Sequence, residues 1–155
     1  MLDLIASTRV AEIELRPAVR VKPSTTLAEV VSAMQAGRRG AALIEDAEGR
    51  LLGIFTERDL MMRVDHGDIA WRDVPVANVM TARPAVIAAA GTIGDALRSM
   101  ASGRRRHVPV VDGDGRAQAL VSIRDILRHF AECFPQEFLN LPPDPRHEAS
   151  KPWGG

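Results

Sequence analysis

Residues 53–59 read GIFTERD and residues 119–125 read ALVSIRD, so a similar pattern occurs twice, 66 positions apart. Sliding the sequence by that distance aligns residues 10–62 with 76–128 without a gap. Twelve of these 53 pairs are identical, whereas unrelated segments of this composition match at roughly 6 to 7% of positions. The chain is therefore expected to hold two similar supersecondary units.

Each copy is predicted to have the element order β-α-β-β-α, which makes an α+β fold. A capping-box pattern begins an amphipathic helix, a glycine is expected to end it with a positive φ, and two apolar runs around a tight turn predict a β-hairpin. The expected segments are strands at 19–21, 41–44 and 51–55 with helices after Thr26 (ending at Gly37) and Thr56 in the first copy, and strands at 85–87, 108–111 and 117–121 with helices after Thr92 (ending at Gly103) and Ser122 in the second.

The chain divides into four predicted parts. They are the first repeat with the N-terminal segment at 1–64, a linker at 65–75, the second repeat at 76–134, and a tail at 135–155. The tail holds five of the ten prolines, which excludes a long helix. We expect only the first part of the tail to dock, on the core or on a second subunit. The apolar residues available for this contact are Phe134, Phe138, Leu139 and Leu141.

The overall composition argues against several classes of protein. The 155 residues carry a formal net charge of zero and a pI near 6.9, so no global field draws the chain to nucleic acid or to an anionic membrane. Cys133 is the single cysteine, which excludes an intramolecular disulfide. No apolar run approaches the length of a membrane span, and the N-terminus lacks an apolar signal segment. We expect a cytoplasmic protein.

The tandem repeat, with its Gly-Arg-Arg step, its D-x-x-G-R hairpin turn and its closing motif, resembles the cystathionine-β-synthase (CBS) domain pair, or Bateman module, over residues 10 to about 132. The resemblance implies two repeats packed as a pseudo-two-fold pair of the free-standing type, which forms a disc-like homodimer. It also implies two related clefts between the repeats for an adenosine-containing ligand such as AMP, ADP, ATP or S-adenosylmethionine, with no other cofactor required.

By this resemblance each cleft draws on both repeats. The motif aspartate accepts hydrogen bonds from the ribose hydroxyls, while the Thr or Ser hydroxyl, the helix N-terminal amides and the motif arginine face the phosphates. The candidate residues are Thr56, Arg58, Asp59, Ala85, Arg105, Arg106 and Ala41 for the first cleft, and Ser122, Arg124, Asp125, Val19, Arg39, Gly40 and His107 for the second. We rank the Asp59 cleft higher, because Ala119 replaces the usual Gly and Glu14 lies near the second opening.

Simpler roles compete with ligand binding at these positions. The motif residues Thr56 with Asp59 and Ser122 with Asp125 also form ordinary helix caps, and the two roles are compatible. The arginines at 38–39 and 104–106 also suit a solvated helix end, where cations offset the dipole. His129 and Cys133 lack a second ligand pair, so we reject a zinc site.

Three functions follow from these readings. The leading hypothesis is a regulatory protein without catalytic activity, in which an adenine nucleotide stabilises one arrangement of the repeats and an unknown partner protein reads the altered surface. The alternative is a structural module that dimerises through the helices at 57–64 and 123–132 and leaves its clefts empty. An enzyme acting on a nucleotide has the least support, because no paired acid and base or metal cluster is evident.

Overall fold

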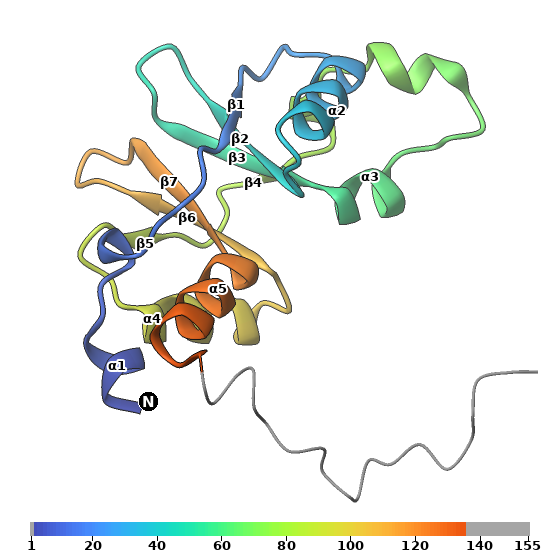
Figure 1. The fold of residues 1–155 in the computed structure, drawn as a ribbon. Helices are drawn as coiled ribbons and strands as arrows, with labels where there is room; N and C mark the ends of the chain where they lie inside the picture. The colour runs from blue at the N-terminus through green and yellow to red at the C-terminus, as the bar shows by residue number, and fades with distance from the viewer. Residues whose placement is uncertain (1, 136–155) are drawn as a thin grey trace, which may run out of the picture.

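The computed structural model describes residues 2–135, so Phe138, Leu139 and Leu141 lie outside the described residues. It shows the predicted β-α-β-β-α order twice, in two units that lie one above the other in Figure 1. The first part of the chain forms α1 (Leu2–Ser7), η1 (Val10–Glu12), β1 (Val19–Val21), α2 (Leu27–Ala36), β2 (Ala41–Glu45), β3 (Leu51–Thr56) and α3 (Glu57–Arg63). The rest forms η2 (Ile69–Asp73), η3 (Val76–Asn78), β4 (Thr81–Ala82), β5 (Ile87–Ala88), α4 (Ile93–Ser102), β6 (His107–Val111), β7 (Ala117–Ser122) and α5 (Ile123–Cys133).

The strands form two sheets with similar pairing. The first has the order β1-β2-β3-β4 and the second β5-β6-β7, and in each the first pair is parallel and the second is an antiparallel hairpin. Both hairpin turns are built alike: Asp46 Oδ1 accepts hydrogen bonds from two backbone N–H groups, as Asp112 Oδ1 does, and Gly49 and Gly115 take φ of 80° and 78°. The β4 strand has no counterpart in the second sheet of the described chain.

Both sheets are apolar on both faces, because one face packs on helices and the other faces the second sheet. On β2, Ala42 and Ile44 point to the helices, while Ala41 and Leu43 contribute to the cluster between the sheets, as expected from the period-2 alternation of a strand. Leu120 of β7 joins that same central cluster. The interface between the sheets therefore belongs to the hydrophobic core.

The segment that precedes each repeat packs into the core of the other repeat. Val10 and Ile13 belong to the cluster built around α4 and α5, and Val76 belongs to the cluster of the first repeat. Equivalent backbone hydrogen bonds fix the two crossings, from the N–H of Val10 to Gly91 O and from the N–H of Val76 to Thr25 O, both at 2.9 Å. In Figure 1 the N-terminal segment accordingly lies with the lower unit. Neither core is complete without the other repeat.

The two units also contact each other through hairpins and side chains. The N–H of Leu51 donates to Gly115 O and the N–H of Ala117 donates to Gly49 O, which joins the two hairpin turns. Arg20 on β1 pairs with Glu45 at 2.6 Å and donates to the carbonyls of Ala117 and Gln118 at 3.0 Å. The pseudo-symmetric hairpin bonds and the Arg20 contacts, which have no counterpart at Val86, hold the repeats in a fixed relation, which positions the clefts between them.

The four predicted capping boxes are confirmed, but the predicted helix ends are wrong in detail. Gly37 and Gly103 have φ of −79° and −96°, and the positive φ falls one residue later, at Arg38 and Arg104. The physical reason is that α2 and α4 continue one residue further than a C′ glycine implies, so each glycine is the C-cap itself and the following arginine is the C′ residue. The residue after it then closes the helix with a hydrogen bond to the carbonyl three residues back.

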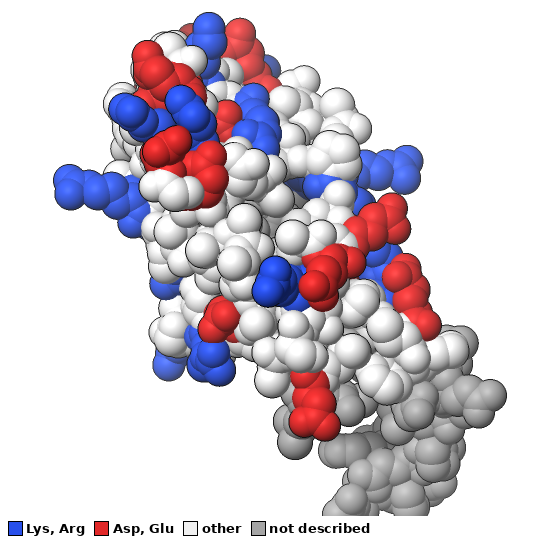
Figure 2. All heavy atoms as spheres, turned by 90° about the vertical axis from the view of Figure 1, so that its left-hand side faces the viewer, with Lys and Arg blue, Asp and Glu red and all other residues white. Residues whose placement is uncertain are grey.

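The surface shows no large area of a single charge on the face seen in Figure 2, where acidic and basic side chains are intermixed. Among residues 2–135, no helix has both the length and the apolar character that a membrane span requires. Phe134, at the end of α5, packs against the core of the second repeat.

Candidate functional site: two clefts between the repeats

Asp59 is held rigidly at the start of α3 by the capping box. Its backbone N–H donates to Thr56 Oγ1 at 3.2 Å, and its Oδ2 accepts from the N–H and the hydroxyl of Thr56 at 2.9 and 2.8 Å. The residue is 8% exposed. Its other carboxylate oxygen, Oδ1, lies 3.3 Å from the Nε of Arg63, one turn further along the helix. The cap therefore uses one oxygen and leaves the other directed at the neighbouring space.

That space is a cleft of about 830 Å³ between the repeats, within the range of small-molecule sites. Its walls come from β3 and α3 of the first repeat, the 81–85 segment, and the 103–109 segment of the second repeat. The lining residues are Gly40, Ile54, Thr56, Glu57, Arg58, Asp59, Met62, Arg63, Thr81, Arg83, Pro84, Ala85, Gly103, Arg104, Arg105, Arg106, His107 and Pro109.

The cleft is strongly cationic although the whole chain is neutral. Six arginines line it against two carboxylates, Glu57 and Asp59. An anion with several charges is the natural complement of such a wall, because arginine donates several hydrogen bonds in a fixed plane. The arginines are Arg58, Arg63, Arg83, Arg104, Arg105 and Arg106.

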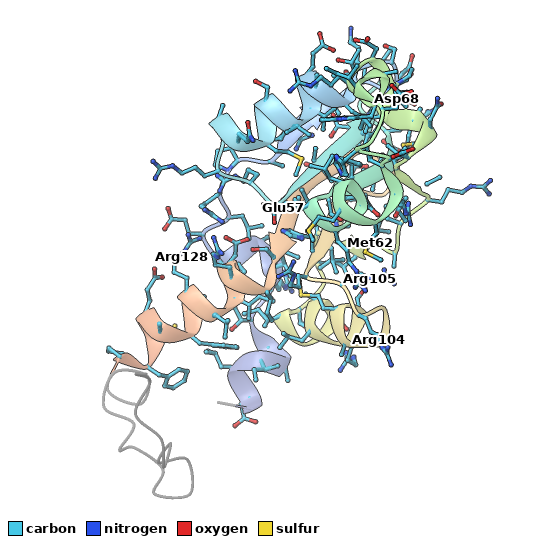
Figure 3. All side chains as sticks on the ribbon, turned by 90° about the vertical axis from the view of Figure 1, so that its right-hand side faces the viewer. Glu57, Met62, Asp68, Arg104, Arg105 and Arg128 are labelled. Carbon is cyan, nitrogen blue, oxygen red and sulfur yellow. The ribbon has the colours of Figure 1, made fainter. Side chains whose placement is uncertain are left out.

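Two of these arginines sit on strained backbone. Arg83 and Arg104 both have φ of 47°, a left-handed conformation that is costly for a residue with a Cβ. Beside them, a Cβ at Gly103 would collide with the guanidinium of Arg105, so this glycine makes room for the arginine to fold back. Figure 3 shows Arg104 and Arg105 below Met62 where the repeats meet, while Arg128 lies on the other side of Glu57. The backbone thus directs cationic side chains into one cleft.

The second motif has the same local geometry. Asp125 Oδ2 accepts from the N–H of Ser122 at 3.0 Å and from its hydroxyl, and the carboxylate is 4% exposed. Its Oδ1 lies 3.3 Å from Arg128, which is the position equivalent to Met62, and 3.5 Å from the Nε of Arg16. The two motif aspartates therefore differ in what surrounds them, since their capping is equivalent.

The space in front of Asp125 is nearly filled. The cavity that Asp125 itself lines has about 30 Å³, close to the volume of one water molecule. A third hollow of about 390 Å³ shares Arg16, Arg39, Gly40, His107 and Ser122 with this cavity, but Asp125 does not line it. Arg16 enters it from the N-terminal segment, and Arg39 donates from its Nε to Pro17 O at 2.8 Å. Burial and the neighbouring Arg16 guanidinium lower the pKa of Arg39. The part of the second cleft next to Asp125 is thus occupied by the chain's own side chains.

The difference between the clefts begins at Gly53 and its counterpart Ala119. A Cβ at Gly53 would collide with the Sδ of Met80 and would lie 3.0 Å from Thr81 O, so glycine admits the segment that forms β4. Ala119 packs its methyl group on the helix side of β7, and residues 15–16, the counterparts of β4, do not join that sheet. Arg16 is therefore free to turn into the second cleft.

The structure brings most of the sequence-predicted site residues together. Thr56, Arg58, Asp59, Ala85, Arg105 and Arg106 line the large cleft; Arg39, Gly40, His107, Ser122 and Asp125 line the small cavity; and Arg124 lines a third hollow. Two of the predicted residues lie elsewhere in the structure. Ala41 lines the small cavity instead of the large cleft, because it points between the sheets; Val19 packs on the helix side of the first sheet, because it pairs with Ala42.

Several residues of the large cleft were missed. Arg104 carried a signal, because Arg38 and Arg104 form an identical pair of the repeat alignment. Arg63 also carried one, because a residue four positions after Asp59 lies on the same face of the helix. Arg83 and Met62 carried no local signal, since only the packing of distant segments places them there.

His107 lies between the clefts and lines both, together with the third hollow of about 390 Å³ beside α2 and α3. Burial and the adjacent Arg106 lower the pKa of His107, so the neutral form is favoured. A Cβ on Gly40 would lie 3.2 Å from Glu57 Oε2 and 3.3 Å from the His107 ring, which shows how closely these groups meet. A charge at this junction affects both clefts.

With this geometry established, the comparisons with known proteins assign a class. The model of the CBS domain matches residues 10–66 and 76–132. The chain belongs to the CBS domain family and contains two such domains in tandem. A curated relative, an uncharacterized 17.7 kDa protein of Acidianus ambivalens, is 31% identical over 132 residues, which is 85% of this chain and 79% of the relative.

Solved structures support the same assignment. A CBS-domain containing protein from Agrobacterium tumefaciens has 33% sequence identity and a TM-score of 0.71, covering 79% of this chain and 98% of its own. A CBS domain protein from Pyrobaculum aerophilum complexed with AMP shares the fold at 24% identity and a TM-score of 0.69, over 86% of this chain and 99% of its own. Some longer relatives differ: the chain spans 20% of inosine-5'-monophosphate dehydrogenase from Mycobacterium leprae.

Proposed function

We propose that the chain is a regulatory protein that binds an adenine nucleotide in the Asp59 cleft and transmits the bound state to a partner protein. The observation that carries this proposal is a cationic cleft of about 830 Å³ with a rigidly capped carboxylate at its edge. The AMP complex of the Pyrobaculum aerophilum protein supports adenosine as the ligand class, since that protein has the same fold.

The cleft offers complementary groups for each part of a nucleotide. Asp59 Oδ1 is the acceptor for the ribose hydroxyls, because Oδ2 is already used by the cap. The Thr56 hydroxyl with Arg58, Arg105 and Arg106 faces the phosphates, where charge-assisted hydrogen bonds are the strongest available. The apolar walls that suit the adenine ring are formed by Ile54, Met62, Pro84, Ala85 and Pro109.

The second set of residues is proposed as a weaker, conditional site. Ser122, Arg124 and Asp125 repeat the motif, and Arg39, Gly40 and His107 lie near it. About 390 Å³ is open at Ser122 and Arg124, but only about 30 Å³ at Asp125, where Arg16 lies, so contact of a ribose with Asp125 requires a movement of Arg16.

The short helix α3 connects the cleft to an exposed apolar surface. Asp59 lies in the first turn of this short helix, while Met61 on it is 74% exposed. A ligand that contacts the start of α3 therefore biases a helix whose outer face is apolar and accessible. Coupling to a partner requires only that the partner prefers one of the two arrangements.

Thermal unfolding in the presence of ligands tests the proposal. We expect AMP, ADP, ATP or S-adenosylmethionine to raise the unfolding midpoint and GTP to leave it unchanged; a hundredfold excess over Kd adds about 2.7 kcal/mol of stability. Asp59→Ala should abolish the shift. Asp95→Ala is the matched control, because Asp95 forms the same type of cap with Thr92 and does not line the cleft. Equal shifts in both variants would contradict the ribose role of Asp59.

A purely structural dimerisation module is the second candidate, and exposed apolar side chains on α3 and α5 favour it. Met61 is 74% exposed and Leu127 is 49% exposed. We expect Met61→Glu combined with Leu127→Glu to convert a homodimer to a monomer in sedimentation velocity. A dimer that binds none of the panel would favour the structural module over the nucleotide sensor.

A further inference from the structure

The N-terminal segment is fixed against the second cleft by three contacts. Arg128 donates to Glu14 O at 2.6 Å, Arg39 donates to Pro17 O at 2.8 Å, and between these anchors the Nε of Arg16 lies 3.5 Å from Asp125 Oδ1. Arg39 lies in the loop between α2 and β2 and lines the cavity, and Arg128 lies on α5, one turn after Asp125. The segment therefore places the guanidinium of Arg16 against the carboxylate oxygen that the cap leaves available.

This arrangement makes Arg16 a competitor for the position that a ribose would take. In the described part of the chain, the equivalent oxygen of Asp59 pairs only with Arg63, from its own helix, at 3.3 Å. The residue equivalent to Arg16 in the other half is Ala82, which is held in β4 by pairing with Gly53. Within residues 2–135, no ion pair joins Asp59 to the preceding segment, although Arg83 of that segment lines the large cleft.

The contact is also displaceable. Within residues 2–135, the Nε of Arg16 is the single buried side-chain nitrogen or oxygen without a hydrogen-bond partner, so its loss of hydration is uncompensated. The Arg16 side chain as a whole is 33% exposed, which gives it a path back to solvent. A group that binds Asp125 with good hydrogen bonds can therefore replace it.

We propose that Arg16 is a specificity-determining residue that closes the Asp125 cleft, so that the chain binds one adenine nucleotide at Asp59 and admits a second only when Arg16 is displaced. This inference rests on the proposed function. If the cleft is open one-tenth of the time, its apparent affinity falls about tenfold, because only the open form binds.

Calorimetric titration with AMP as the probe tests this on the wild-type chain and on Arg16→Ala. We expect one site per chain in the wild type, two in Arg16→Ala, and one again in Arg16→Ala/Asp125→Ala. The apparent affinity at the second site should rise at least about tenfold on removing Arg16. Circular dichroism and the Asp59 site in the same titration report whether the variant is folded.

The possible outcomes separate the two proposals. Two sites of equal affinity in the wild-type chain would overturn the role of Arg16, and this result needs no variant. One site in both the wild type and Arg16→Ala, abolished in each by Asp59→Ala, would also overturn it and would leave the proposed function standing. Absence of AMP heat in both proteins, with no other adenosine ligand active in the unfolding panel, would overturn the proposed function and this inference together.

Discussion

The two clefts carry the same motif but differ in the space next to the motif aspartate. Asp59 lines a cleft of about 830 Å³, whereas Asp125 lines a cavity of about 30 Å³, and the hollow of about 390 Å³ at Ser122 and Arg124 does not include it. Both aspartates are N3 residues of a capping box with equivalent hydrogen bonds. The difference arises in the segment before each sheet, which forms β4 in one half and inserts Arg16 in the other. A motif therefore defines the chemistry of a site, while the neighbouring segment decides whether that site is open.

The largest effect is expected from exchanging the residues at the origin of this difference. Gly53→Ala places a methyl group against Met80 and Thr81 O, and overpacking of this kind costs about 1 to 3 kcal/mol in unfolding free energy. Ala119→Gly makes no collision and should cost only about 0.5 to 1 kcal/mol through backbone entropy. Urea unfolding of both variants measures the two values.

A double variant checks the cause of the Gly53 effect. Gly53→Ala combined with Met80→Ala should cost less than the sum of the single changes, because the second substitution removes the colliding atom. If Gly53→Ala and Ala119→Gly proved equally costly, the glycine would not be the feature that admits β4, and the asymmetry would need another origin.

A smaller effect is expected at Arg104 and Arg38, which are equivalent residues with φ of 47° and 50°. Arg104 lines the Asp59 cleft, whereas Arg38 lines only the third hollow. Arg104→Ala should weaken ATP binding about tenfold, or about 1.4 kcal/mol, and AMP binding less, since ATP presents more phosphate oxygens. Calorimetry with both nucleotides measures this difference.

Arg38→Ala is the matched control, because the strained backbone and the loss of one charge are the same in both variants. We expect it to leave both affinities unchanged. An equal loss in the two variants would indicate a general effect of net charge and would remove Arg104 from the phosphate wall.

The repeat, the element order and the caps could be predicted because each depends on local chemistry. A Thr or Ser three positions before Asp or Glu specifies a helix start whatever the rest of the chain does. The hairpins could be predicted equally well, because Asp46 and Asp112 accept hydrogen bonds from backbone N–H groups of their own turns. The helix ends were placed one residue early, because the positive φ was assigned to the glycine, the residue that adopts it at least cost, and not to the arginine that follows.

The openness of the clefts could not be predicted from the sequence. The filling of the Asp125 cleft depends on how residues 14–17 cross to the second repeat, which is set by contacts more than one hundred residues apart, such as Arg128 with Glu14 O. From the sequence, Ala119 and Glu14 predict a weaker second cleft. In the structure, however, it is Arg16 that fills the space and the backbone of Glu14 that anchors the segment.

The smallest effect concerns His107, the residue that the two clefts share. Burial and Arg106, and to a lesser extent Arg124, lower its pKa in the folded state, while the carboxylates of Glu57 and Asp125 act in the opposite direction. As the pH falls through about 6.5, His107 therefore becomes protonated in the unfolded chain but remains neutral in the folded chain. Because the unfolded state then binds more protons, the unfolding free energy should fall as the pH is lowered from 6.5 toward the folded pKa.

Unfolding measured from pH 7.5 to 5.5 isolates this contribution when the wild type is compared with His107→Asn, because the other histidines are common to both proteins. We expect the wild type to lose more stability over this interval, by a small fraction of the total, since one partly buried group is involved. Parallel curves would show that His107 takes up a proton in the folded state as readily as in the unfolded one. In that case water would screen the charge of His107 well enough that the two clefts would not influence each other through this residue.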